Sequence, residues 1–128
     1  MKIKQLSIFL QNKLGRFSEM ATILGEAGIN MQAFTVAENA EFGIVRLIVS
    51  DAERAAKILI EHSFAVSVNE IFLLDMPDVP GALASYVNRL SDAGVFIEYM
   101  YAFSGANGKA VVALKPSDAE LCEKVLKG

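Results

Sequence analysis

The chain has 128 residues, enough for one ordinary domain or two very small ones. Hydrophobic residues make up 53% and charged residues 21%, a balance that is typical of globular proteins and excludes a disordered chain. The net charge of −3 argues against a nucleic-acid or anionic-membrane partner, because both favour a basic surface.

One cysteine, Cys122, excludes an intramolecular disulfide and fits a reducing compartment, so we expect a cytoplasmic protein. No apolar run approaches the roughly 20 residues that a membrane-spanning helix needs, so no membrane association is expected. The N-terminal segment lacks a small-residue cleavage site and favours a first strand over a signal peptide.

The predicted elements begin with a strand over residues 3–10, which are apolar and partly β-branched. From Phe17 to Ala27, apolar residues recur at spacings of three and four, which predicts a helix that stops at Gly28. Residues 30–37 and 42–49 predict two strands around a turn at 38–41. Residues 50–53 (Ser-Asp-Ala-Glu) form a capping-box pattern before a second helix, and residues 64–68 predict a final strand.

The same order of predicted strands and helices occurs twice in the sequence. A shift of 66 residues aligns Gly15 and Gly28 with Gly81 and Gly94, and a shift of 67 aligns residues 45–59 with 112–126. Asn107-Gly108 predicts the hairpin turn of the second copy. We therefore expect an α+β fold of two ferredoxin-like βαββαβ units, residues 1–70 and 71–128, with antiparallel sheets and helices on one face. The second unit lacks its last strand.

Catalytic groups are sparse. His62 and Cys122 lie in different copies, where a helix-end role and a buried small residue are the simplest interpretations. No metal-ligand spacing, Walker loop or GxGxxG motif occurs, so we predict no enzyme activity, no cofactor and no metal.

The RNA-recognition module shares the predicted order of elements and stacks bases on aromatic residues of its third strand. Residues 41–49 contain Phe42 and Gly43, but aliphatic residues follow where stacking rings belong, and residues 107–115 contain no ring. We therefore expect no nucleic-acid binding.

A glycine stands between the first strand and first helix of each copy, at Gly15 and Gly81. A helix N-terminus carries unpaired N–H groups and partial positive charge, so a carboxylate can dock where glycine leaves clearance. The alternative is that Asn12 or Asp78 caps the helix and the glycine only shapes the turn. The residues alone leave both interpretations open.

Residues 78–103, "DVPGALASYVNRLSDAGVFIEYMYAF", resemble the ACT domain, a small regulatory module that binds amino acids. The family pattern is an Asp-x-Pro-Gly corner, a helix and then Ala-Gly-Ile/Val-Asn-Ile. The second copy follows it from Asp78 to Ile97, except that Phe96 replaces Asn. The first copy follows it from Gly15 to Met31 but departs at Asn12 and Leu14, where the family often has Asp and Pro. The whole chain resembles tandem ACT proteins.

The resemblance implies a non-catalytic sensor that binds a free amino acid near the glycine corners, at a seam between ACT units. It also implies that the partner is a separate metabolic enzyme and that units pair side by side. The expected ligand-binding residues, with the second copy favoured, are Asn12, Leu14, Gly15, Arg16, Phe17, Met31, Gln32, Asp78, Val79, Pro80, Gly81, Ala82, Leu83, Ile97, Glu98, Tyr99 and Met100.

The alternative function is a ligand-free interaction module that uses the same seam for assembly. A homodimer is expected in either case, because the missing last strand should leave part of the strand at residues 71–76 without a partner at the sheet edge.

Overall fold

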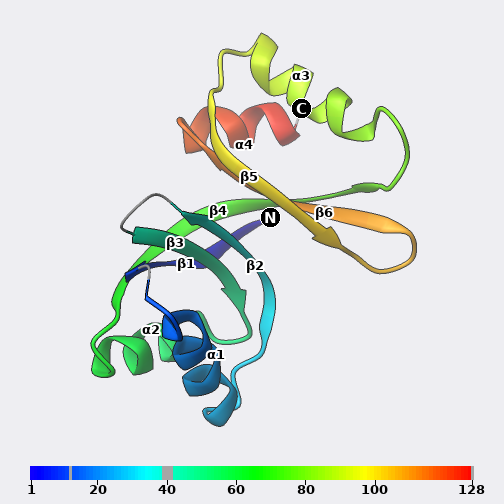
Figure 1. Ribbon diagram of the computed structural model, residues 1–128. Helices are drawn as coiled ribbons and strands as arrows, with labels where there is room; N and C mark the ends of the chain where they lie inside the picture. Colours follow the sequence, from blue (N-terminus) through cyan, green and yellow to red (C-terminus); the bar gives the residue numbers. More distant parts are fainter. Residues whose placement is uncertain (12, 39–41, 128) are drawn as a thin grey trace. The chain divides into compact units, whose positions relative to one another are not determined.

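The computed structural model describes residues 1–11, 13–38 and 42–127 (Figure 1). The chain divides into two compact units, which we call the first unit (Lys4–Glu70) and the second unit (Met1–Ile3 with Ile71–Gly128). The described elements are β1 (Lys2–Gln11), α1 (Arg16–Glu26), β2 (Met31–Glu38), β3 (Phe42–Val49), α2 (Ala52–Glu61), β4 (Ala65–Pro77), α3 (Ala82–Asp92), β5 (Ile97–Ser104), β6 (Lys109–Pro116) and α4 (Ala119–Lys127).

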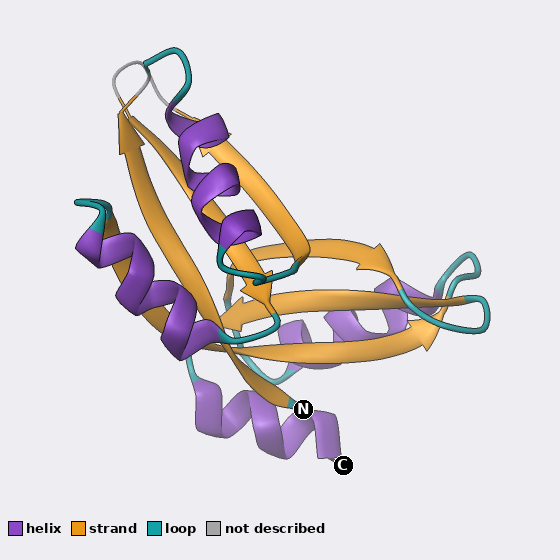
Figure 2. Cartoon of the chain, turned by 90° about the horizontal axis from the view of Figure 1, so that it is seen from below, coloured by secondary structure: helices purple, strands orange, loops and turns teal. Residues whose placement is uncertain are grey.

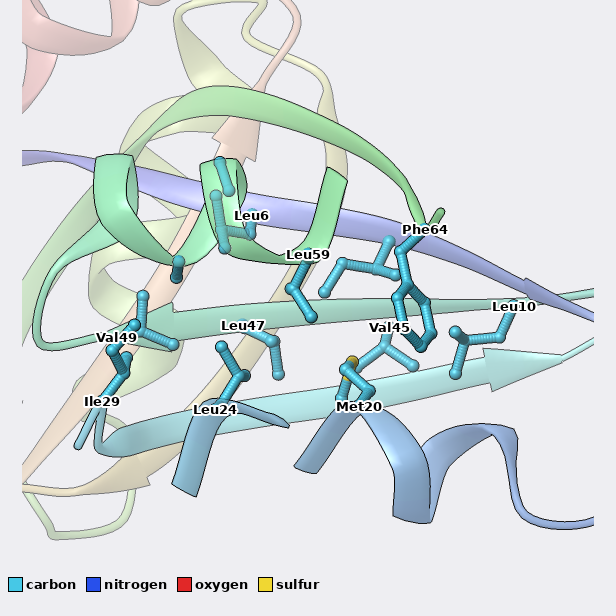
Figure 3. Close-up of a cluster of buried hydrophobic side chains, with 13 residues drawn as sticks. Leu6, Leu10, Met20, Leu24, Ile29, Val45, Leu47, Val49, Leu59 and Phe64 are labelled. Atoms are coloured by element: carbon cyan, nitrogen blue, oxygen red, sulfur yellow. The ribbon is translucent and has the colours of Figure 1, made fainter. Parts of the chain in front are cut away.

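The first unit is an antiparallel sheet with two helices on one side (Figure 2). Its strand order is β2-β3-β1-β4, and the register pairs Leu6 with Leu47 and Leu10 with Gly43. Figure 3 shows Leu6, Leu47 and Val45 of the sheet facing Met20, Leu24 and Leu59 of the helices, all fully buried. The apolar spacing of α1 and α2 therefore faces the sheet, and the predicted α+β fold is confirmed.

The second unit repeats this plan in the order β4-β6-β5 around a smaller core. Its buried members are Phe72, Leu90, Val95, Leu114 and Cys122. The predicted turn is confirmed: Asn107 and Gly108 have φ of 58° and 73°, the left-handed pair that a tight hairpin requires.

The expected open edge of the second unit is covered at one point. The backbone N–H of Leu73 donates to the carbonyl of Met1 at 2.8 Å, so Met1–Ile3 stand where a last strand would lie. The part of residues 71–76 that lacks a partner therefore does not include Leu73, whose pairing with Met1 spans 72 positions of the sequence and is hidden from local sequence patterns.

β4 is longer than predicted. The sequence suggested one strand over 64–68 and another starting near Ile71, but Ala65–Pro77 is a single strand of 13 residues. No glycine or proline occurs in it before Pro77, so nothing in the sequence interrupts the extended backbone.

The predicted capping-box pattern assigns the N-cap of the helix to the wrong residue. Asp51, not Ser50, is the N-cap of α2, and its side chain accepts from the N–H of Arg54 at 3.2 Å. The Ser50 hydroxyl instead accepts from the N–H of Asn30 at 3.1 Å. The second copy repeats the exchange: Asp118 accepts from the Leu121 N–H at 3.1 Å, and the hydroxyl of Ser117 accepts from the N–H of Phe96 at 3.2 Å. Each serine therefore ties the end of one strand to the start of its neighbour.

The turn predicted at residues 38–41 falls largely on 39–41, which lie outside the described residues. No helix in the described part of the chain is long and apolar enough to cross a membrane.

Candidate functional site

The two glycine corners have the same backbone. Gly15 and Gly81 are the N-caps of α1 and α3, each with φ of +88°. A Cβ added at either position would meet no atom within 4 Å, so the approach to each helix end is open. The left-handed φ explains why glycine stands there, because other residues adopt it at a cost.

The start of α1 has backbone donors to offer. The N–H of Glu19 bonds to the Gly15 carbonyl at 2.9 Å, which is the first full turn of the helix. Among the described residues, no acceptor bonds the N–H groups of Phe17 and Ser18. These N–H groups and the helix dipole favour an anion at this corner.

A groove of about 640 Å³ lies beside the first corner. Its size is within the range of roughly 300–1,000 Å³ that small-molecule sites occupy. It is lined from both sides of the corner by β1, α1, β2 and β3, through Leu10, Gln11, Lys13, Leu14, Arg16, Phe17, Phe34, Val36, Gly43 and Val45.

The charge in this groove is positive. Lys13 and Arg16 are the charged side chains that line it, and no carboxylate is among its described lining residues. The Arg16 guanidinium bonds to Glu19 at 2.9 Å and lies 4.2 Å from the centre of the Phe64 ring. The ring and the ion pair hold Arg16 in one place, so its charge is positioned before any ligand arrives.

Arg16 also lines a second hollow of about 310 Å³, together with Phe9, Gln11, Phe42, Ser63 and Ala65. Phe9 and Phe42 are 49% and 45% exposed, so two half-open rings flank this hollow. Arg16 thus lines both of these hollows.

Leu14, Arg16 and Phe17 of the predicted site meet in the groove, and Gly15 shapes the corner between them. Met31 packs against the core of the first unit, and Gln32 is exposed. Asn12 lies outside the described residues, so its predicted role stays a prediction.

Sequence reasoning missed Phe34 and Val36 of β2. Strict alternation puts Met31 and Ala33 on one face of the strand. The register shifts between these two residues, where Met31 pairs with Val49 but Ala33 pairs with Ile48. The bulge moves Phe34 and Val36 to the helix side, where the Phe34 ring lies 5.8 Å from that of Phe17. No residue type in the sequence marks this bulge.

The second corner has different side chains. Val79 and Leu83 are 58% and 45% exposed, and the N–H of Asp78 donates to the carbonyl of Gly108 at 3.2 Å. Pro80, Gly81 and Ala82 complete the turn into α3.

On β5, the predicted residues divide between core and surface. Ile97 packs against the core of the second unit, and Glu98 pairs with Lys115 at 3.2 Å. Tyr99 and Met100 pair in register with Lys115 and Leu114 of β6. No observation brings a ligand to these residues, and their role stays a prediction.

The reactive side chains Cys122 and His62 are not among the described lining residues of the groove. The Cys122 thiol is fully buried, and burial, followed by the nearby Asp118 carboxylate, raises its pKa. The Nδ1 atom of His62 lies 2.9 Å from the carbonyl oxygen of Ile58 at the end of α2. Within the described ranges, no three His, Cys, Asp or Glu side chains gather as a metal site would require.

Two glycine-cornered βαββ units, each with a second helix, define a pair of small ferredoxin-like domains, and a family comparison agrees. The family of the ACT domain pair matches residues 1–127, and the chain belongs to this family.

Among solved structures, the chain is similar to protein BT0572 from Bacteroides thetaiotaomicron, with 49% identity and a TM-score of 0.94 over 99% of this chain and 88% of that one. It shares its fold with the regulatory subunit of aspartate kinase from Thermus thermophilus, at 16% identity and a TM-score of 0.69, covering 97% and 88% of the two chains. The corresponding subunit from Thermus flavus has 14% identity and a TM-score of 0.65, covering 99% and 94%. A comparison with curated proteins finds no match.

Proposed function

We propose that this protein is a non-catalytic regulator that binds a free amino acid in the groove beside Gly15. The observation that carries the proposal is the meeting of an apolar groove, a cationic pair and a helix N-terminus at one glycine corner. These features suit a small amphipathic anion. The apolar groove suits its carbon chain, the two cations suit its charge, and the N–H groups of the helix N-terminus suit its hydrogen-bond acceptors.

Each part of the ligand has a partner in this proposal. The carboxylate faces Arg16 and Lys13 and the N–H groups at the start of α1, because like arrangements stabilise anions in proteins. The Gln11 side chain lines the same groove and offers an oxygen to the ammonium group. The side chain of the ligand packs against the rings of Phe17 and Phe34.

A thermal-shift screen with all twenty amino acids tests the function. A ligand that binds only the native state stabilises it by about 2.7 kcal/mol at a hundredfold excess over Kd. Calorimetry on Arg16→Gln should then show at least tenfold weaker binding, about 1.4 kcal/mol. Arg54→Gln is the matched control, because Arg54 is an exposed arginine of α2 outside the groove lining. Equal binding by folded Arg16→Gln and the control would contradict the site.

A homodimer is part of the proposal. β2 ends the strand order of the first unit, and its Phe34 and Val36 are 53% and 52% exposed. An edge strand with apolar side chains is a surface that a second chain can cover. Light scattering across micromolar concentrations tests this, and a monomer throughout that range would refute it.

The same exposed edge favours a second candidate, a ligand-free assembly module. It predicts a dimer and no thermal shift with any amino acid. In either case the regulated partner is a separate metabolic enzyme, and the unpaired buried thiol of Cys122 supports a cytoplasmic location.

A further inference from the structure

The floor and walls of the groove beside Gly15 are apolar. Leu10 and Val45 form a buried floor, at 5% and 0% exposure. Above them stand Phe17 and Phe34, with ring centres 5.8 Å apart at an interplanar angle of 48°. Tilted rings at this distance form a wall against which a branched or aromatic side chain can pack.

Polar ligand side chains find few partners there. Apart from Gln11, the polar side chains in the described lining are Lys13 and Arg16, which carry the charge that a carboxylate requires. Gln11 is exposed, in contrast to the buried Leu10 and Val45 of the floor. A ligand with a hydroxyl, amide or ammonium group in its side chain would bury that group without a partner, which lowers affinity.

The second copy does not repeat this chemistry. The repeat aligns Val79 and Ala82 with Lys13 and Arg16, so both cations are absent from the second corner. Met100 and Ala102 stand at the positions of Phe34 and Val36, so the aromatic wall is absent as well. The backbone is shared, with φ of +88° at both glycines, but the side chains that select a ligand are not.

We propose that the groove selects amino acids with large apolar side chains, and that each chain binds one such ligand, at the first corner only. This inference rests on the proposed function, since it names the ligand class and stoichiometry of that site. One methylene in an apolar pocket changes affinity by roughly tenfold or more, so leucine should bind at least tenfold tighter than alanine.

Isothermal titration calorimetry tests the ligand class with the full chain. Leucine, isoleucine, methionine and phenylalanine are compared with alanine, serine, threonine, aspartate and lysine. The expected result is at least tenfold tighter binding of one or more of the first four, with a stoichiometry near one per chain.

Phe34→Ala tests the wall. Phe34 is half exposed, so the variant should keep its fold, and affinity for the best apolar ligand should fall at least tenfold. Ile60→Ala is the matched control, because Ile60 is an exposed apolar residue of α2 outside the groove lining and its loss should leave affinity unchanged. Val36→Ser provides a second change to the same wall if circular dichroism shows that Phe34→Ala is unfolded.

The outcomes separate the two proposals. Tightest binding of a polar amino acid, or two ligands per chain, overturns this inference and leaves the amino-acid sensor standing. Unchanged affinity in a folded wall variant also overturns the inference. No binding of any amino acid by the folded parent overturns both.

Discussion

Met1 and Leu73 exchange two hydrogen bonds across the sheet of the second unit. The N–H of Leu73 donates to the carbonyl of Met1 at 2.8 Å, and the ammonium group of Met1 donates to the carbonyl of Leu73 at 3.2 Å. Lys2 strengthens this contact, because its ammonium group lies 2.8 Å from the Glu123 carboxylate and 5.8 Å from the centre of the Phe72 ring. Residues Met1–Ile3 thus belong to the second unit, together with the C-terminal half of the chain.

Removing Met1 and Lys2, with methionine placed at position 3, should destabilise the second unit. Each lost hydrogen bond contributes about 0.5–1.5 kcal/mol, so we expect about 1–3 kcal/mol in urea unfolding. Hydrogen exchange at the Leu73 amide should become faster, whereas that of Leu47 in the first unit should change less. Equal acceleration at both amides would show that the effect is global and would contradict the local contact.

Acid should weaken the same region through Glu123. Lys2 and then Lys127 hold the pKa of its carboxyl down to about 2, from an ordinary value of 4.5. A lowered pKa in the folded state contributes stability above pH 4.5, and this contribution is lost as pH falls from 4.5 to 2. Glu123→Gln should therefore lower the unfolding temperature at pH 6 and converge with the parent near pH 2.

High salt is the control for this prediction, because the Lys2 and Glu123 side chains are partly exposed and their attraction is screened. A difference between parent and variant that stays constant from pH 6 to pH 2 would contradict the ion pair as its cause.

Substitution at Gly15 should act through the backbone. Gly15→Ala has space for its Cβ but must adopt φ of +88°, which costs about 1–2 kcal/mol. Gly15→Asn should cost less, because asparagine tolerates the left-handed region. Denaturant unfolding measures both, and a ligand test at this corner is cleaner with asparagine than with a branched residue.

Gly25 provides the matched control in the same helix. It lies in α1 without positive φ, and an added Cβ would meet nothing within 4 Å. Gly25→Ala should therefore stabilise the protein by about 0.4–1 kcal/mol. If both Gly15→Ala and Gly25→Ala lowered stability, steric crowding of the new Cβ, and not the backbone conformation, would be the cause.

The Cys122 thiol should be inert in the folded protein. Burial raises its pKa and keeps reagents away, so an aromatic disulfide reagent at pH 8 should react slowly without denaturant and fully with it. Cys122→Ser should cost about 1–3 kcal/mol, since it buries a hydroxyl in the core. Cys122→Ala should cost less, because Ala55 fills the equivalent buried position of the first copy. Fast labelling of the folded chain would contradict this account.

The buried helix faces and the hairpin turn were predictable from the sequence, because they depend on local spacing and residue type. The pairing of distant strands was not predictable. The helix faces around Met20 and Leu24 follow from local spacing, and the turn at Asn107-Gly108 follows from residue type. The N-cap was misplaced by one residue, because serine and aspartate both cap helices and only the chain geometry selects between them.

The lining of the groove was predictable in part. The glycine corner marked Leu14, Arg16 and Phe17, which do line the groove. Phe34 and Val36 were missed, because the register shift after Met31 depends on how β2 pairs with β3. Long-range pairing also hid Met1 beside Leu73.

The matching corners have a practical consequence. Gly15 has φ 88° and ψ −6°, and Gly81 has φ 88° and ψ −14°, so the two turns are interchangeable as scaffolds. Residues 13–17 can therefore be transplanted onto positions 79–83 with the dihedral angles of the central glycine nearly unchanged. Because the protein is duplicated, it is suited to loop grafting within one chain: the first copy supplies the loop and the second copy supplies the scaffold that receives it.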